Sequence, residues 1–235
     1  MKALAEQIRA QLRDLGDPER RESSRRFFKE PVQFYGVKSA DVKKIARQAI
    51  QALKQRPKEE VFSLCEQLWQ SGYLEEGGVA CELAHALRDQ YAPEDFRHFD
   101  HWLEQYVSNW AACDSLCNHS VGDFVMIFPE RINDLKLWTA SPNRWKQRAA
   151  AVSLIIPARR GLFLPDVFEI ADRLLPSTDD LVQKGYGWML KAASQAYPQE
   201  VFAFLMERQA TMPRTAFRYA LEKLPPELRR QAMQG

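Results

Sequence analysis

The sequence predicts an all-α protein, an α-solenoid built from helical-hairpin repeats. Five prolines recur at intervals of 36, 36, 36 and 33 residues, and related segments rich in small residues lie between them. Alternating runs of Val, Ile and Thr, which would indicate strands, are absent. A period of about 36 residues leaves room for two helices of about 12 residues each, which is typical of helical solenoids.

Each of the five prolines is predicted to mark the start of the first helix of a repeat. Proline suits the first helical position because its missing N–H has no partner there. Acidic and then apolar residues follow it, and acids in the first turn complement the helix dipole. Pro18 lies 39 residues before the first of the five. The five are Pro57, Pro93, Pro129, Pro165 and Pro198.

The second helix of each repeat is predicted from segments rich in Ala and Gly. Small side chains let neighbouring helices approach closely, and the repeats must stack because one repeat cannot bury its own apolar face. Residues 1–14 are charged and amphipathic and predict a first helix, whereas residues 12–24 predict a polar connection. The predicted second helices cover residues 78–87, 110–124, 145–155, 183–193 and 214–221.

Length and composition indicate one domain over residues 1–235. The chain is 46% hydrophobic with a formal net charge of +2, and it is long enough to bury a sizeable core. No apolar run approaches the roughly 20 residues that a membrane-spanning helix requires, and the charged N-terminal segment does not have the pattern of a signal peptide. We therefore expect a cytoplasmic protein that does not enter the membrane.

The four cysteines lie on apolar faces of the predicted helices, where buried and unreactive thiols are usual. Cys113 and Cys117 are one turn apart with His119 nearby, but a structural zinc site needs four ligands with familiar spacing. That spacing is absent, so we expect no metal. Unpaired thiols agree with a reducing, cytoplasmic setting.

Four side chains recur at about one repeat length: Trp110, Asp114, Arg148 and Trp188. Asp114 and Arg148 are 34 residues apart, and Arg148 and Trp188 are 40 apart. At similar places in stacked repeats they would line one face, and Trp110 and Asp114 would be neighbours on one helix. Further cations, Arg144, Lys146, Lys184, Lys191 and Arg214, cluster near the same helices.

Two interpretations of this face stay open from the residues alone. In the first, both tryptophans belong to the core and Arg148 forms a structural salt bridge with Asp114. In the second, the face is a cationic concave groove that binds a phosphate backbone, with the aromatics and the carboxylate turned toward a sugar or base. Residues 135–235 carry 15 Lys/Arg against 9 Asp/Glu, a surplus that agrees with the second interpretation. Solvated helix faces often carry such a surplus too.

Three motifs resemble the AlkD-type DNA alkylation repair glycosylases. They are Trp110-Ala-Ala-Cys-Asp-Ser, Trp145-Lys-Gln-Arg-Ala-Ala and Gln183-Lys-Gly-Tyr-Gly-Trp, and the resemblance extends to Phe34-Tyr-Gly-Val. It implies an α-solenoid of HEAT-like helical-hairpin repeats with a concave DNA-binding face. Phe27 stands where the family has a tyrosine, and Lys191 where an arginine is usual. A less polar Ala111-Ala112-Cys113 precedes the aspartate. These departures affect affinity and adduct range more than the reaction type.

The resemblance implies hydrolysis of the N-glycosidic bond of cationic N3- or N7-alkylated purines in duplex DNA, the first step of base excision repair. Asp114 would stabilise the oxocarbenium-like transition state and orient the attacking water. Trp110 and Trp188 would present electron-rich faces to the sugar, and Arg148 would hold the phosphate at the lesion. Family members are thought to act without enclosing the base, and no metal or organic cofactor is implied.

The DNA-binding residues expected from this resemblance are Arg144, Lys146, Lys184, Lys191, Arg214 and Phe27. We expect a monomer associated with the nucleoid. Two alternatives are a non-catalytic protein of the same scaffold that binds DNA or RNA structures, and a protein-binding helical scaffold. Salt-sensitive binding of nucleic acid without base release would indicate the first alternative. Absence of binding to phosphate-rich polymers would indicate the second.

Overall fold

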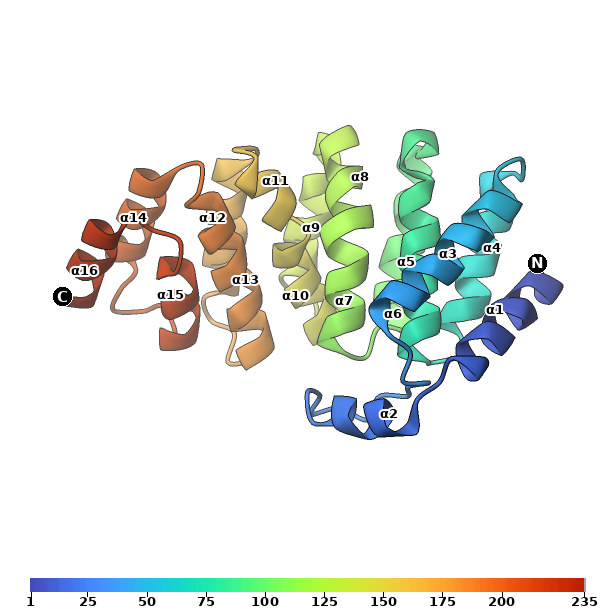
Figure 1. The fold of residues 1–235 in the computed structure, drawn as a ribbon. Helices are drawn as coiled ribbons and strands as arrows, with labels where there is room; N and C mark the ends of the chain where they lie inside the picture. Colours follow the sequence, from blue (N-terminus) through green and yellow to red (C-terminus); the bar gives the residue numbers. More distant parts are fainter. Residues whose placement is uncertain (235) are drawn as a thin grey trace. The chain divides into compact units, whose positions relative to one another are not determined.

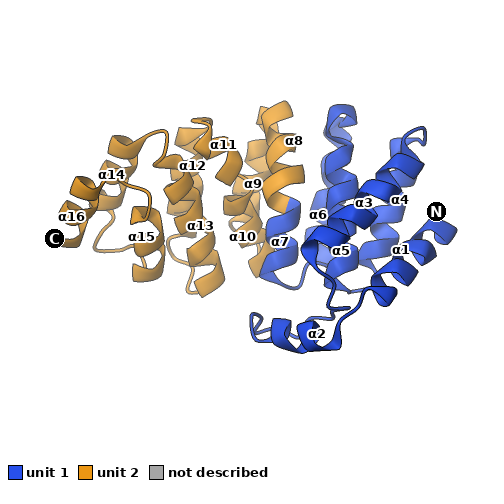
Figure 2. Cartoon of the chain, in the orientation of Figure 1, with its two compact units in different colours: residues 1–116 blue, residues 117–235 orange. Residues whose placement is uncertain are grey.

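The computed structural model describes residues 1–234, and its regular structure is helical (Figure 1). Extended backbone pairs once among these residues, at an isolated bridge between Gln33 and Tyr73. The chain divides into two compact units, residues 1–116 and the residues from 117 onward (Figure 2). The all-α prediction is therefore confirmed, while the single domain over residues 1–235 stays a prediction.

Helices of the first unit pack around a shared core of large side chains, among them the fully buried Leu64, Phe99 and Trp102. Helix α5 packs against both α3 and α4, and α1 contacts the same three helices. The helices are α1 (Lys2–Asp14), α2 (Pro18–Arg25), α3 (Ser39–Leu53), α4 (Lys58–Trp69), α5 (Leu74–Ala86), α6 (Phe96–Gln105) and α7 (Trp110–Leu116), with 3-10 turns at Arg88–Gln90 and Pro93–Asp95.

In the second unit α13 is central, because it packs against α10, α11, α12 and α15. This unit begins with a π-helical turn at Cys117–Val121 and has a 3-10 turn at Pro129–Arg131. Its helices are α8 (Gly122–Ile127), α9 (Ile132–Trp138), α10 (Arg144–Val152), α11 (Ile155–Arg159), α12 (Leu164–Leu174), α13 (Asp180–Ala193), α14 (Pro198–Glu207), α15 (Arg214–Leu221) and α16 (Pro226–Gln234).

The periodic prolines do mark helix starts. Pro198 is the first residue of α14 and Pro165 the second residue of α12, while Pro57 directly precedes α4. Pro93 and Pro129 open 3-10 turns that lead into α6 and α9. The prediction is therefore confirmed. Its physical reason is that proline has no N–H to lose at a helix start.

The predicted second helices are present, but α5 and α13 begin earlier than predicted, at Leu74 and Asp180, and two others differ in their internal structure. The helix expected at 110–124 passes through a π-helical turn and runs on to Ile127. The helix expected at 145–155 is split into α10 and α11 at Ser153 and Leu154. Pro157 lacks the N–H that would bond the carbonyl of Ser153, so the helical hydrogen-bond ladder is interrupted there.

The polar connection predicted for residues 12–24 is wrong. Helix α1 continues to Asp14, and α2 begins at Pro18. Asp17 caps α2 because its carboxylate accepts a hydrogen bond from the backbone N–H of Arg20 at 3.1 Å. An aspartate followed by a proline is a helix-start signal, and it was present in the sequence.

All four cysteines are buried, as predicted, and none of them forms a disulfide. Burial raises the pKa of the Cys65 and Cys81 thiols, so these side chains stay protonated. None of the described helices is both long enough and apolar enough to cross a membrane.

Candidate active site and nucleic-acid interface

Trp110 and Asp114 lie on the same helix, α7, in the first unit. The helix begins at Trp110, and the buried Asn109 caps it by accepting a hydrogen bond from the backbone N–H of Ala112 at 2.9 Å. Asp114 follows one turn later and is half-buried. A carboxylate placed one turn from an indole can face the same bound group as that indole.

The indole of Trp110 is held by the segment that follows α2. Its Nε1 donates a hydrogen bond to the carbonyl oxygen of Phe27 at 3.2 Å. The ring of Phe28 stacks on it, with centroids 5.4 Å apart and planes inclined by 14°. The side chain of Phe27 is 65% exposed, and the Arg26 guanidinium lies 5.7 Å from its ring centroid. Phe28 was not among the predicted site residues, although two adjacent aromatic residues in a polar segment were a signal.

Helix α2, which the sequence analysis also missed, carries exposed cations. Arg21 and Arg25 on the helix, and Arg26 directly after it, are exposed, and Arg25 lies 3.4 Å from Glu22 in a surface ion pair. Such exposed pairs contribute little free energy, so they hold the arginine only weakly. The surface of α2 can therefore contribute to phosphate binding beside the exposed ring of Phe27.

In the second unit Arg148 is buried against α13, with 5% of its surface exposed. Its guanidinium donates a hydrogen bond to the carbonyl oxygen of Leu181 in the first turn of α13. A Cβ at Gly185 would lie 3.4 Å from Cγ of Arg148 and 3.6 Å from Nη1, so the glycine makes room for this side chain. Contacts with α13 therefore set the position of the Arg148 side chain. Its role in holding a phosphate stays a prediction.

Arg144 forms a two-point ion pair with Asp179. Its Nε lies 2.7 Å from Oδ2 and its Nη2 lies 2.9 Å from Oδ1. Asp179 also caps α13, since Oδ1 accepts hydrogen bonds from the backbone N–H groups of Leu181 and Val182. The Arg144 guanidinium lies 4.9 Å from the ring centroid of Trp145. One carboxylate thus serves both the helix and a predicted DNA-binding cation.

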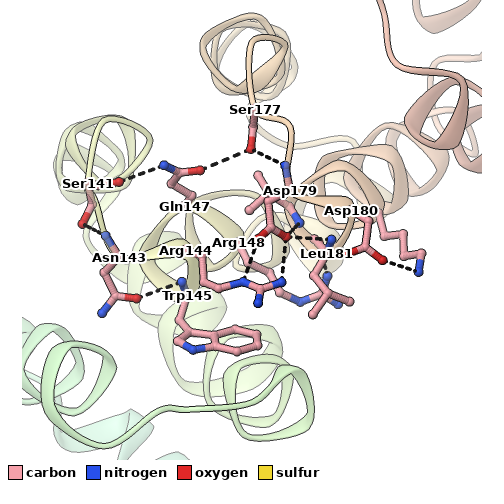
Figure 3. A network of polar contacts seen from close by, with 12 residues as sticks. Ser141, Asn143, Arg144, Trp145, Gln147, Arg148, Ser177, Asp179, Asp180 and Leu181 are labelled. Carbon is pink, nitrogen blue, oxygen red and sulfur yellow. Dashed lines mark hydrogen bonds and ion pairs between the residues drawn. The ribbon is translucent and has the colours of Figure 1, made fainter. Parts of the chain in front are cut away.

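A polar pattern repeats at the starts of α10 and α13, and Figure 3 shows its members Ser141, Asn143, Gln147, Ser177 and Asp179. Gln147 donates to the carbonyl oxygen of Ser141 at 2.8 Å, and Gln183 donates to that of Ser177 at 2.9 Å. Asn143 caps α10 as Asp179 caps α13. Each pair is 36 residues apart, so a Ser-x-Asn/Asp-x-x-x-Gln motif was visible in the sequence and was missed.

Lys184, Trp188 and Lys191 share one face of α13, because they are spaced by four and three residues. All three are half-buried. Lys184 pairs with Asp180 at 3.2 Å, and Lys191 forms an ion pair with Glu222. The predicted cations of this face are therefore accompanied by carboxylates of the same unit.

The two remaining predicted cations, Lys146 and Arg214, lie in the first turns of α10 and α15. Lys146 is half-buried and Arg214 is exposed. Within the described part of the chain, no three His, Cys, Asp or Glu side chains are grouped so that they could hold a metal ion.

Cations beside aromatic side chains are common on protein surfaces that bind nucleic acid. A family model described as "DNA alkylation repair enzyme" matches residues 8–224. The chain belongs to this family, which supports a role in the repair of alkylation damage and a DNA substrate. The family predicted from the three motifs is thus confirmed.

A solved structure described as "Predicted DNA alkylation repair enzyme from Enterococcus faecalis" has a similar fold. Its TM-score is 0.80 at 19% sequence identity, and the alignment covers 90% of this chain and 97% of that chain. This likeness confirms the helical-repeat fold class. None of the curated proteins compared with the chain gives a significant match.

Proposed function

We propose that the protein is a DNA glycosylase that hydrolyses the N-glycosidic bond of cationic N3- or N7-alkylated purines in duplex DNA. The observation that carries the proposal is Asp114, a half-buried carboxylate one turn after Trp110, whose indole is bonded to Phe27 and stacked on Phe28. Family membership adds the alkylated DNA substrate.

The chemistry suits these groups. An alkylated purine already carries a positive charge, so it leaves without help from a general acid. As the bond between C1′ and the purine nitrogen breaks, its electrons neutralise the purine and positive charge develops on the deoxyribose. The Asp114 carboxylate stabilises that charge, orients the water that attacks C1′ and accepts its proton. The face of the Trp110 indole adds cation–π stabilisation.

The other predicted residues contribute to binding in this proposal. Arg144, Lys184 and Lys191 provide positive charge for backbone phosphates, and Lys146 and Arg214 add to it. Arg148 and Trp188 keep the roles predicted for them, at the phosphate and the sugar. Phe27 offers an exposed aromatic surface in place of a tyrosine hydroxyl.

The test is release of free 7-methylguanine from methylated duplex DNA by the wild type and by Asp114→Asn. We expect release by the wild type and a loss of at least about 100-fold in the variant, with DNA affinity changed less than about twofold. Asp134→Asn, which removes a half-buried carboxylate from α9, is the matched control and should keep the wild-type rate.

Two results would contradict the proposal. Release by Asp114→Asn at the wild-type rate would remove the carboxylate from the mechanism. Tight, salt-sensitive DNA binding with no release by the wild type would favour the non-catalytic binding protein.

A further inference from the structure

The segment between α2 and α3, residues 26–37, forms a strap that reaches Trp110. Phe28 covers one face of the indole by stacking, and the carbonyl of Phe27 accepts its N–H. The indole is therefore restrained by a face contact and an edge contact at the same time. With one face covered by Phe28, only the opposite face of the ring is left for a sugar.

The far end of the strap is anchored by the carboxylate of Glu75, in the first turn of α5. Its Oε2 accepts a hydrogen bond from the backbone N–H of Tyr35 at 3.1 Å. Its Oε1 accepts from the N–H groups of Gly36 at 2.8 Å and Val37 at 3.1 Å. Glu75 is 7% exposed, and three bonds to one buried carboxylate are strong because the acceptor is charged.

The strap is also packed against the start of α2. Gly36 has φ +88°, and a Cβ there would lie 2.2 Å from the carbonyl oxygen of Asp17 and 3.0 Å from the backbone nitrogen of Arg21. The buried Phe34 lies between the anchor and the stack, with its ring centroid 5.3 Å from that of Phe28. A continuous set of contacts therefore runs from Glu75 to Trp110.

We propose that Phe28 and Glu75 are positioning residues that hold the Trp110 indole in its reactive orientation. The inference rests on the proposed function, because it assigns Trp110 to the reacting sugar. Phe28 acts through the stack and selects the face of Trp110 that stays open. Glu75 acts through the strap backbone and fixes the carbonyl that bonds the indole N–H.

Three variants test this proposal. Phe28→Leu keeps an apolar side chain and removes the ring stack, Phe28→Tyr keeps the stack, and Glu75→Gln weakens the anchor. The matched control is Phe168→Leu, which breaks a stack of the same kind with Phe204, where centroids lie 4.4 Å apart at 10°. That stack joins α12 and α14, which carry no residue of the predicted site.

Two readouts separate positioning from general stability. The first is the single-turnover rate of 7-methylguanine release at saturating enzyme, beside the DNA dissociation constant. The second is the 19F NMR resonance of Trp110 in protein labelled with 5-fluorotryptophan, assigned from its loss in Trp110→Phe. Phe28→Leu and Glu75→Gln should lower the rate by about tenfold or more, with affinity within about twofold, and should shift the resonance.

Phe28→Tyr should restore both the rate and the resonance, and Phe168→Leu should change neither. An unchanged rate in Phe28→Leu, or equal losses in Phe28→Leu and Phe168→Leu, would overturn the positioning role. If the wild type releases no base, the proposed function fails and the catalytic part of this inference fails with it. A Trp110 resonance that moves in Phe28→Leu and returns in Phe28→Tyr would still support the restraint by the strap.

Discussion

Replacing Asp179 by Asn should strengthen DNA binding. In the structure this carboxylate is paired with the Arg144 guanidinium, with N–O distances of 2.7 and 2.9 Å. It therefore competes with a DNA phosphate for Arg144. The helix cap should survive, because Asn143 already caps α10 at the equivalent place in the preceding repeat. The substitution therefore removes one negative charge and leaves the local helix start intact.

The magnitude follows from the geometry of the pair. Two unit charges about 4 Å apart in a watery environment interact by about 1 kcal/mol, which corresponds to about a fivefold change in affinity. If Arg144 then makes one more phosphate contact, the slope of log affinity against log salt should steepen by about 0.9. The side chains of the pair are 35% and 26% exposed, so the free energy of unfolding should fall by no more than about 1 kcal/mol.

The assay is fluorescence anisotropy with an undamaged duplex at several salt concentrations, with thermal unfolding measured in parallel. Asp172→Asn is the matched control, because Asp172 binds Arg208 through the same two-point geometry, at 2.5 and 2.9 Å. That pair joins α12 to the end of α14. Equal affinity gains in both variants would show only a change of net charge, and no gain in Asp179→Asn would refute the reasoning.

Two further predictions concern stability. Tyr186 is fully buried, and its hydroxyl has no hydrogen-bond partner among the described residues. Tyr186→Phe should therefore raise the free energy of unfolding, measured by urea titration, by about 1 kcal/mol. A decrease would contradict this prediction. Burial alone would raise the pKa of Glu66, but hydrogen bonds from Tyr106, Trp102 and His101 lower it. A carboxylate with a depressed pKa stabilises the fold above its unfolded value of about 4.3, and that contribution is lost as the pH falls through the folded pKa. The stability difference between wild type and Glu66→Gln should thus be largest near neutral pH and shrink in acid; a constant difference would contradict it.

The helix starts could be predicted because their chemistry is local. Proline without an N–H, acids in the first turn and a cap such as Asp17 act within four residues, so a short stretch of sequence contains the whole signal. The same reasoning applies to the split between α10 and α11 at Ser153 and Leu154, which was not predicted although its cause, the missing N–H of Pro157, is also local. The sequence contains a local signal for each of these features.

Part of the candidate site could be predicted in the same way. Trp110 and Asp114 are neighbours because they are four residues apart on one helix, and Lys184, Trp188 and Lys191 share a face for a similar reason. The contacts that hold these residues were not predictable. Phe27 accepts the hydrogen bond of Trp110 from 83 residues away in the chain.

The period of the repeats, the helix starts and the residues that share a helix face follow from the amino-acid sequence alone, because they depend on neighbours within one or two turns. Three contacts depend instead on how distant segments pack: Glu75 anchors the strap, Arg148 donates to the carbonyl of Leu181, and Asp179 both caps α13 and pairs with Arg144. The partner of a buried polar side chain depends on which donor or acceptor a packed neighbouring segment brings within about 3 Å. Local helix propensity does not depend on that distance, so it cannot predict the partner.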